Sequence, residues 1–156
     1  MERTFVMLKP DAMQRGLAGE ILARLEKKGL NLVAAKIMRL EDAMLDVHYA
    51  HHKSKPFFPK LKQFMKSSPV LAAVWQGKEA VKVVRDLVGP TNGRNALGGT
   101  IRGDYSNSQS CNLIHASDSV ETAEAEIKRF FKPAEIVSWD WHSIQYVYSP
   151  EEVVKE

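Results

Sequence analysis

The sequence predicts an α/β chain in which about four short strands alternate with amphipathic helices. Apolar runs of strand length, closed by proline, glycine or polar residues, indicate the strands, and apolar stripes at helical spacing lie between them. The 156 residues, of which 44% are hydrophobic and 26% charged, fit one globular domain over residues 1–156. Strict alternation favours a parallel doubly wound sheet. The element order also fits a ferredoxin-like β-α-β-β-α-β core with an added helical pair, and periodicity alone leaves both folds open.

The first predicted strand, residues 4–8, is an unbroken apolar run that indicates a buried strand. Lys9-Pro10-Asp11 ends it, because proline cannot donate to a sheet ladder and aspartate favours a turn. An apolar helical stripe follows over residues 17–25, and a basic last turn with the glycine cap Gly29 closes that helix. A second strand is predicted over residues 30–40, although its alternation is imperfect.

The middle of the chain is predicted to add a helical pair before the third strand. Residues 41–52 are helical in composition, and a shorter helix is predicted around residues 61–65. An apolar run over residues 69–75 indicates the third strand. The helical stripe over residues 80–88 then ends at Gly89-Pro90, a pair that cannot continue a helix.

Two segments fall outside this alternation. Between residues 89 and 105 the pattern stops, and this stretch contains five glycines. A long irregular segment inside a compact domain is usually functional or disordered. Residues 138–156 are expected to form a C-terminal docking tail, and its polar part from Asp140 onward carries Trp141, Tyr146 and Tyr148. Aromatic side chains in such a tail indicate docking, either on this subunit or on a neighbour.

The composition excludes several classes of protein. The 22 Lys and Arg against 19 Asp and Glu give a net charge of only +3, so an anionic partner is expected to meet a focused basic site. Cys111 is the single cysteine, which excludes an internal disulfide, and it is expected to be a buried, unreactive thiol. No apolar run approaches membrane-spanning length, and the N-terminus lacks the pattern of a signal peptide. A cytoplasmic protein without a membrane partner is therefore expected.

Chemistry is most strongly indicated where a strand leads into a helix. Residues 112–116 are predicted to be a short buried strand, and apolar side chains then recur at helical spacing over residues 120–130. Asp118 is the expected N-cap of this helix, with Glu121 completing a capping-box-like pair. His115 thus lies at a strand end beside a helix N-terminus, which favours a nearby anion.

Two side chains near His115 can orient its ring. Ser117 supplies a hydroxyl and Glu126 a carboxylate. An imidazole with an orienting acid and a positive helix end suggests a nucleophile that attacks phosphate. The plainer alternative is a strand-end histidine whose hydrogen bonds are satisfied by a neighbour.

Side chains near the other breaks in the pattern share one chemistry. Two arginines, a lysine, a threonine and aromatic faces suit a polyphosphate attached to a sugar and a base, because arginine binds phosphate bidentately and lysine acts as a point charge. Taken singly, each such side chain is usually solvated. The set consists of Lys9, Tyr49, Phe57, Arg85, Thr91, Arg102 and Asn112.

The run Asn112-Leu113-Ile114-His115-Ala116-Ser117-Asp118 resembles the active-site signature of the nucleoside diphosphate kinases. The resemblance extends over residues 3–137 and includes Lys9-Pro10-Asp11 and Thr100-Ile101-Arg102-Gly103-Asp104. The histidine signature combined with the spaced lysine, arginines and threonine is highly specific. It implies a ferredoxin-like βαββαβ fold, an antiparallel four-stranded sheet with added helices. The tail from Trp139 onward matches the family poorly.

The resemblance also implies an activity. The γ-phosphate of a nucleoside triphosphate would move to a nucleoside diphosphate by a ping-pong mechanism, through a phosphohistidine on His115. Glu126, helped by Ser117, would hold the other ring nitrogen. The implied binding set is Lys9 and Asn112 for the sugar and the reacting end, Arg85, Thr91 and Arg102 for the phosphates, Phe57 for the base, and Tyr49 for a phosphate or a sugar hydroxyl.

No protein-held metal is implied. Mg²⁺ would arrive bridging the nucleotide phosphates rather than in a dedicated cage. His48, His51 and His52 have a helical spacing that is compatible with a metal, but no HExxH glutamate or nearby cysteine accompanies them. We therefore expect these histidines to form a solvated polar face.

The family assembles as homo-oligomers, so a homo-oligomer is expected, with a hexamer favoured over a tetramer and the C-terminal tail packed on a neighbour. One alternative function is a catalytically silent member that binds nucleotides or nucleic acid. Another is a histidine-phosphate carrier that acts on proteins. Specific nucleic-acid binding is not expected, because an RNP-type pattern of aromatics is missing and +3 is a weak charge for contact with a phosphate backbone.

Overall fold

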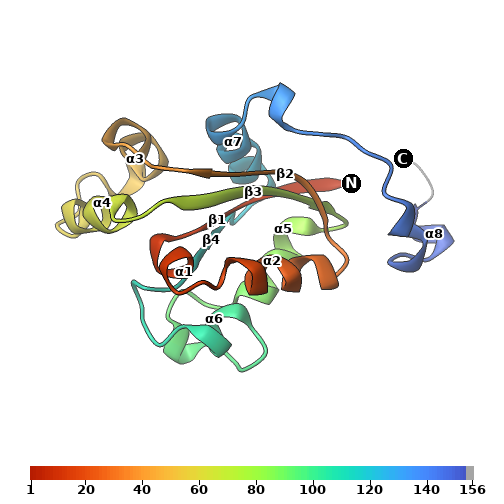
Figure 1. Cartoon of the computed structure of the whole chain (residues 1–156), viewed down its shortest axis with the longest axis horizontal. Helices are drawn as coiled ribbons and strands as arrows, with labels where there is room; N and C mark the ends of the chain where they lie inside the picture. Colours follow the sequence, from red (N-terminus) through yellow and green to blue (C-terminus); the bar gives the residue numbers. More distant parts are fainter. Residues whose placement is uncertain (154–156) are drawn as a thin grey trace.

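A four-stranded antiparallel sheet forms the centre of the computed structural model, which describes residues 1–153 (Figure 1). The strands are β1 (Glu2–Leu8), β2 (Asn31–Met38), β3 (Val70–Gly77) and β4 (Ile114–Ala116). Their order in the sheet is β2-β3-β1-β4, so β1 pairs with both β3 and β4. This order confirms the ferredoxin-like fold and excludes the parallel doubly wound alternative.

Helices cover both faces of this sheet. They are α1 (Pro10–Gln14), α2 (Ala18–Lys27), α3 (Asp42–His48), α4 (Phe58–Lys66), α5 (Ala80–Val88), α6 (Ile101–Tyr105), α7 (Val120–Phe130) and α8 (Pro150–Val153). Short 3-10 turns span Ala50–His52, Gly93–Asn95, Pro133–Glu135 and His142–Tyr146. In Figure 1, α2 and α5 lie below the sheet and α7 lies above it, whereas α3 and α4 lie at its left end. Within the described residues, no helix has both the length and the apolar character needed to cross a membrane.

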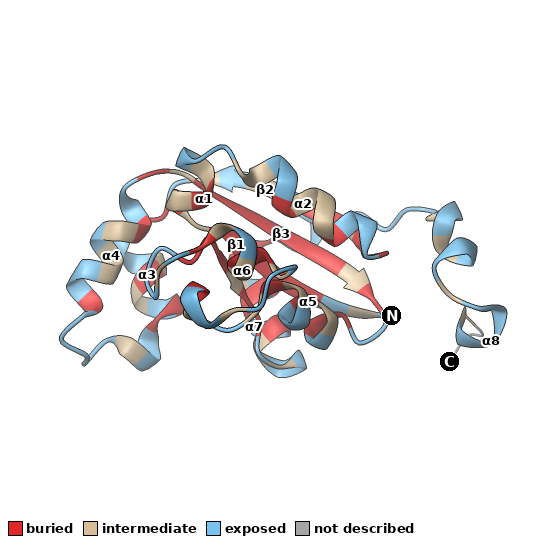
Figure 2. Cartoon of the chain, turned by 90° about the horizontal axis from the view of Figure 1, so that it is seen from below, coloured by how far each residue is buried: buried red, intermediate tan, exposed pale blue. Residues whose placement is uncertain are grey.

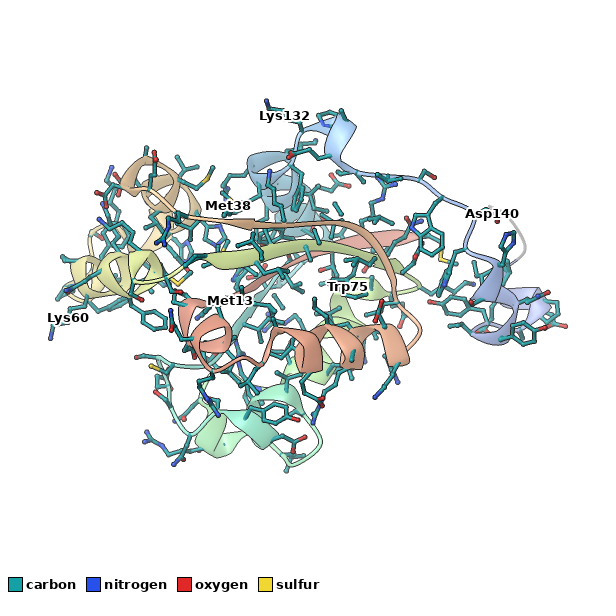
Figure 3. All side chains as sticks on the ribbon, in the orientation of Figure 1. Met13, Met38, Lys60, Trp75, Lys132 and Asp140 are labelled. Atoms are coloured by element: carbon teal, nitrogen blue, oxygen red, sulfur yellow. The ribbon has the colours of Figure 1, made fainter. Side chains whose placement is uncertain are left out.

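Each face of the sheet has its own core. Along β1, Phe5 and Met7 point to the α7 face, and Val6 and Leu8 point to the α2 face; all four are fully buried. The strand is therefore apolar without alternation, and β1 and β3 are largely red in Figure 2. Trp75 of β3 lies in the core on the α2 face, beneath the sheet in Figure 3. The unbroken apolar runs of the sequence follow from burial on both faces.

Three local expectations are wrong. Lys9-Pro10-Asp11 begins helix α1 rather than forming a turn, because proline at the first helical position has a suitable φ and needs no donor there. The segment after residue 89 includes α6, which begins after its N-cap Thr100; the Thr100 hydroxyl accepts a hydrogen bond from the Gly103 amide. A Cβ on Gly103 would lie 1.9 Å from the Leu97 carbonyl oxygen, so this glycine serves close packing. Cys111 is exposed, not buried.

The C-terminal tail contacts its own chain as far as the structure describes it. The Trp139 indole donates to the Leu32 carbonyl of β2 at 3.1 Å. The Tyr148 hydroxyl accepts from the Lys78 amide, just after β3, at 3.0 Å. Residues 154–156 of the predicted tail lie outside the described residues. Docking on a neighbouring subunit stays a prediction.

Candidate active site

His115 lies in the short strand β4, and the backbone just before this strand has a constrained conformation. In the sheet, His115 lies opposite Met7, so its side chain is on the face covered by α7. The predicted strand over residues 112–116 begins only at Ile114, because Leu113 has a φ of +74°. The Leu113 amide donates to the Asp11 carboxylate at 3.0 Å, and its carbonyl accepts from the Lys9 amide at 2.8 Å. These contacts from the Lys9-Pro10-Asp11 segment hold a backbone conformation that is uncommon for leucine.

Helix α7 brings Glu126 to the imidazole of His115. Glu126 lies on the buried face of the helix and is only 4% exposed. One of its oxygens, Oε2, lies 2.7 Å from His115 Nε2 and also accepts a hydrogen bond from Ser117 Oγ at 2.9 Å. Within residues 1–153, no side chain hydrogen-bonds the other ring nitrogen, Nδ1. Ser117 thus reaches His115 only through the shared carboxylate.

The start of α7 differs from the prediction. Ser119 is the N-cap, and its hydroxyl accepts from the Thr122 amide at 3.1 Å. The predicted capping pair of Asp118 and Glu121 is wrong because the helix begins one residue later, at Val120. Asp118 instead lines the cavity in front of His115.

This cavity has a volume of about 360 Å³ and brings together most of the predicted site residues. Lys9, Tyr49, Arg85, Thr91, Arg102 and Asn112 line it together with His115 and Glu126. Phe57 is not part of the lining; it is 49% exposed, and its ring packs edge-on against that of His52, with the centroids 5.1 Å apart. A larger hollow of about 800 Å³ between the start of β1 and α7 contains no histidine.

Lys9 and Asn112 form a pair on one wall of the cavity. The Lys9 ammonium donates to Asn112 Oδ1 at 2.7 Å, and the Asn112 amide donates to the Thr91 carbonyl at 3.0 Å. Desolvation, followed by the positive charge of Arg102, lowers the pKa of Lys9 to about 8. The lysine is therefore cationic at neutral pH at an energetic cost, and an anion in the cavity would relieve that cost.

Arg102 is held firmly by the backbone around the site. Its guanidinium donates to the Asn112 carbonyl at 3.1 Å and to the Gly89 carbonyl at 3.0 Å, and the side chain is buried. Burial, followed by the charge of Arg85, lowers the pKa of Arg102 to about 10. Lys9, Arg85 and Arg102 thus concentrate positive charge in one cavity, an arrangement that favours a polyanion.

His48 was missed as part of the site. It is 5% exposed rather than solvated, and its ring packs edge-on against that of His115, with the centroids 4.9 Å apart. Its Nδ1 lies 3.0 Å from the Arg129 guanidinium, which can only donate, so the ring proton is on Nε2. Burial, followed by the charges of His115 and Arg129, lowers the pKa of His48 to about 2 and keeps it neutral. His48 follows the buried Leu45 by three residues, so both side chains lie on the same face of α3. This spacing is the sequence signal that could have identified His48 as buried.

Two polar atoms near His115 are buried without a protein partner among the described residues. They are Nε2 of His48 and the hydroxyl of Tyr49. Burial raises the pKa of the Tyr49 phenol well above its usual value, so the hydroxyl keeps its proton. Buried donors of this kind are normally satisfied by a ligand or by water.

The chain is similar in sequence to known proteins. The family model described as nucleoside diphosphate kinase matches residues 2–136. A nucleoside diphosphate kinase of Parabacteroides distasonis is 53% identical over 152 residues, which cover 97% of this chain and 99% of the relative. One from Saccharomyces cerevisiae is 49% identical over 147 residues, or 94% of this chain and 96% of the relative.

A solved structure extends this similarity to three dimensions. It is a halophilic nucleoside diphosphate kinase from Halobacterium salinarum in complex with CDP, with a TM-score of 0.92 and 50% identity. The match covers 94% of this chain and 98% of that one. The chain therefore belongs to the nucleoside diphosphate kinase family.

Proposed function

We propose that this protein transfers the γ-phosphate of a nucleoside triphosphate to a nucleoside diphosphate through a phosphohistidine on His115. The observation that carries this proposal is the state of the imidazole. Glu126 contacts Nε2 at 2.7 Å, whereas Nδ1 has no side-chain partner among residues 1–153. Because His115 lines a cavity with three cationic side chains, one ring nitrogen is available beside an anion site.

The reaction then consists of two transfers. In the first, the Nδ1 lone pair attacks the γ-phosphorus, an N–P bond forms, the P–O bond to the β-phosphate breaks, and the nucleoside diphosphate leaves. In the second, the terminal oxygen of another diphosphate attacks the phosphorus of the phosphohistidine, a P–O bond forms, the N–P bond breaks, and the electron pair returns to Nδ1 of the imidazole. Glu126 accepts a hydrogen bond from the Nε2 proton and stabilises the positive charge that develops on the ring. Ser117 holds the carboxylate in place.

The remaining side chains bind the nucleotide. Arg85, Thr91 and Arg102 take the phosphates and stabilise the charge of a loose transition state. Lys9 and Asn112, already paired at 2.7 Å, take the sugar hydroxyls and the reacting end, and the unpaired Tyr49 hydroxyl is a further donor. Phe57, at the mouth beside His52, stacks on the base. Every base has a π-face, so stacking tolerates all of them.

Mg²⁺ belongs to this proposal as a partner of the nucleotide. Among residues 1–153, no group of three or more His, Cys, Asp or Glu side chains is arranged to hold a metal ion. The cationic lining would disfavour a free ion, so Mg²⁺ would enter already bound to phosphate oxygens, and Asp118 of the lining could hold its water ligands. The ion supplies neutralisation of phosphate charge.

Self-association into a homo-oligomer, with a hexamer favoured over a tetramer, is part of the same proposal, as is a cytoplasmic location where free nucleotides are found. Ile37 on the edge strand β2 is 65% exposed, and Trp139 in the tail is 51% exposed. Exposed apolar side chains of this kind favour burial against another subunit. Light scattering of the purified protein measures the number of subunits.

The function is tested by initial rates with ATP as donor and GDP as acceptor. A ping-pong reaction gives parallel double-reciprocal lines when the fixed substrate is varied. We expect parallel lines for the wild type and no turnover for His115→Ala. His142→Ala, which changes an exposed histidine in the tail, is the matched control and is expected to keep full activity. Intersecting lines would indicate direct transfer in a ternary complex and contradict the proposal.

A further inference from the structure

Positive charge is unevenly distributed along this chain. Residues 47–78 contain six lysines and no aspartate, glutamate or arginine. Because the whole chain carries a net charge of only +3, the rest of the chain carries a net −3. The modest overall charge therefore conceals one strongly basic segment, which includes the end of α3, the loop after it, α4 and β3.

Only part of this basic segment has uncompensated charge. On α4, Lys62 pairs with Asp46 at 2.8 Å and Lys66 pairs with Asp42 at 2.9 Å. Lys60 lies at the outer end of α4 and points away from the molecule in Figure 3. In the loop before α4, Lys53 and Lys55 are both exposed, and neither forms an ion pair within residues 1–153.

Lys53 and Lys55 lie next to the cavity that contains His115. The 3-10 turn Ala50–His52 contributes His51 and His52 to the cavity lining, and Lys53 follows directly. The Lys55 amide donates to the His52 carbonyl at 2.8 Å, which folds this loop back on the turn. Burial, followed by the charges of His51 and Lys55, lowers the pKa of His52, in agreement with this proximity. Phe57 packs against the same His52 ring.

We propose that Lys53 and Lys55 form a cationic entrance that attracts the polyphosphate of incoming nucleotides toward the His115 cavity. The inference rests on the proposed function, since it takes a nucleotide as the occupant. The cavity itself is lined by Lys9, Arg85 and Arg102, so the two lysines extend the same positive field outward. A field of one sign at a cleft raises the rate of encounter with oppositely charged ligands, and salt screens it.

This role differs from that of a phosphate-binding residue. Lys53 and Lys55 are exposed on a loop and act through the field around the entrance, not through a fixed hydrogen bond to the reacting group. They are therefore expected to change the association rate and kcat/KM but not kcat. The size of the change must fall as the salt concentration rises, because the Debye length shrinks from about 20 Å at 0.02 M to about 8 Å at 0.15 M.

The test compares two double variants of equal charge. Lys53→Gln/Lys55→Gln removes the entrance. Lys27→Gln/Lys28→Gln removes two exposed lysines at the C-terminal end of α2, which lies toward the other end of the sheet from α3 and α4 in Figures 1 and 2. The association rate of a fluorescent N-methylanthraniloyl ADP is measured by stopped flow at low and at near-physiological salt. The values of kcat and kcat/KM with GDP are measured under the same conditions.

We expect the entrance variant to associate about fivefold more slowly at 0.02 M salt and about twofold more slowly at 0.15 M, with kcat unchanged. The α2 variant should match the wild type. An equal loss in both variants would overturn the inference, since net charge rather than location would then be responsible. A loss that is independent of salt would overturn it in favour of direct contact, and no loss would overturn it as well. Association of labelled ADP requires no phosphotransfer, so a wild type that binds but does not turn over would refute the proposed function separately.

Discussion

Replacing Glu126 by glutamine should slow the phosphorylation of His115 without weakening nucleotide binding. The Glu126 carboxylate is 4% exposed and accepts from both His115 Nε2, at 2.7 Å, and Ser117 Oγ, at 2.9 Å. Glutamine keeps the shape of the side chain but removes the negative charge that faces the ring. A hydrogen bond to a charged group contributes roughly 1.5–3 kcal/mol. Since each 1.4 kcal/mol is about tenfold in rate, we expect a loss of about 10- to 100-fold.

The loss is measured as a single-turnover rate. Enzyme in excess over γ-labelled ATP is quenched at short times, and the bound label is counted. The affinity for labelled ADP should stay within about twofold of the wild type, because Glu126 contacts the imidazole rather than the nucleotide. Ser117→Ala is the matched comparison: it removes one hydrogen bond to the Glu126 carboxylate but leaves the negative charge facing the ring, so a smaller loss than that of Glu126→Gln is expected. A Glu126→Gln rate equal to that of the wild type would refute the orienting role.

Four further outcomes follow from the contacts and charges of the site. Because the pKa of Lys9 is lowered to about 8, kcat/KM should fall above that pH, and Lys9→Arg should move the fall to higher pH; an unchanged profile would contradict the binding role of Lys9. The same shift means that charged Lys9 destabilises the fold below pH 8, and that this cost is relieved as the pH rises toward 10.5. Phe57→Ala should raise KM for all bases by a similar factor, about 5- to 100-fold from stacking, and a loss confined to one base would count against stacking. Arg129→Met leaves Nδ1 of the buried His48 unpaired, so urea denaturation should show about 1–3 kcal/mol less unfolding free energy, whereas the exposed Lys128→Met should show almost no change.

The sequence located the strands better than it ordered them. Strand β1 was located from the unbroken apolar run Phe5-Val6-Met7-Leu8. Both faces of β1 are covered, so every one of these side chains is buried, and the apolar character that burial requires can be seen directly in the sequence. The order β2-β3-β1-β4 depends on pairing between residues far apart in the chain, such as Met7 with His115, and periodicity contains no such information. Only the resemblance to a family favoured the antiparallel sheet.

The short helices were missed for physical reasons. Helix α1 begins with a proline, and α6 contains a glycine; in a sequence both residues usually indicate a break. In α6 the glycine is required because the Leu97 carbonyl comes too close for any side chain at Gly103. That approach is a tertiary contact and cannot be inferred from local propensity.

The site residues also divide into those that local sequence patterns place and those that only the fold brings together. His115 lies in β4, Ser117 directly follows that strand, and Glu126 lies in the next helix, α7, so local patterning placed them together. Lys9, Arg85, Thr91, Arg102 and Asn112 come from separate segments that only the fold gathers around one cavity. His48 was interpreted as one of three solvated histidines because it was grouped with His51 and His52. Its helical spacing from Leu45, which places both side chains on the buried face of α3, was not considered.

The most direct test of the central claim is to isolate the phosphorylated enzyme. The protein is incubated with γ-labelled ATP and Mg²⁺, the bound label is tested in acid and in alkali, and the labelled protein is then mixed with GDP or UDP. The account predicts an acid-labile, alkali-stable label that is absent from His115→Ala and that either diphosphate removes. An absent label, or one unaffected by His115→Ala, would contradict a phosphohistidine on His115. A label that no diphosphate removes would favour a carrier that acts on proteins.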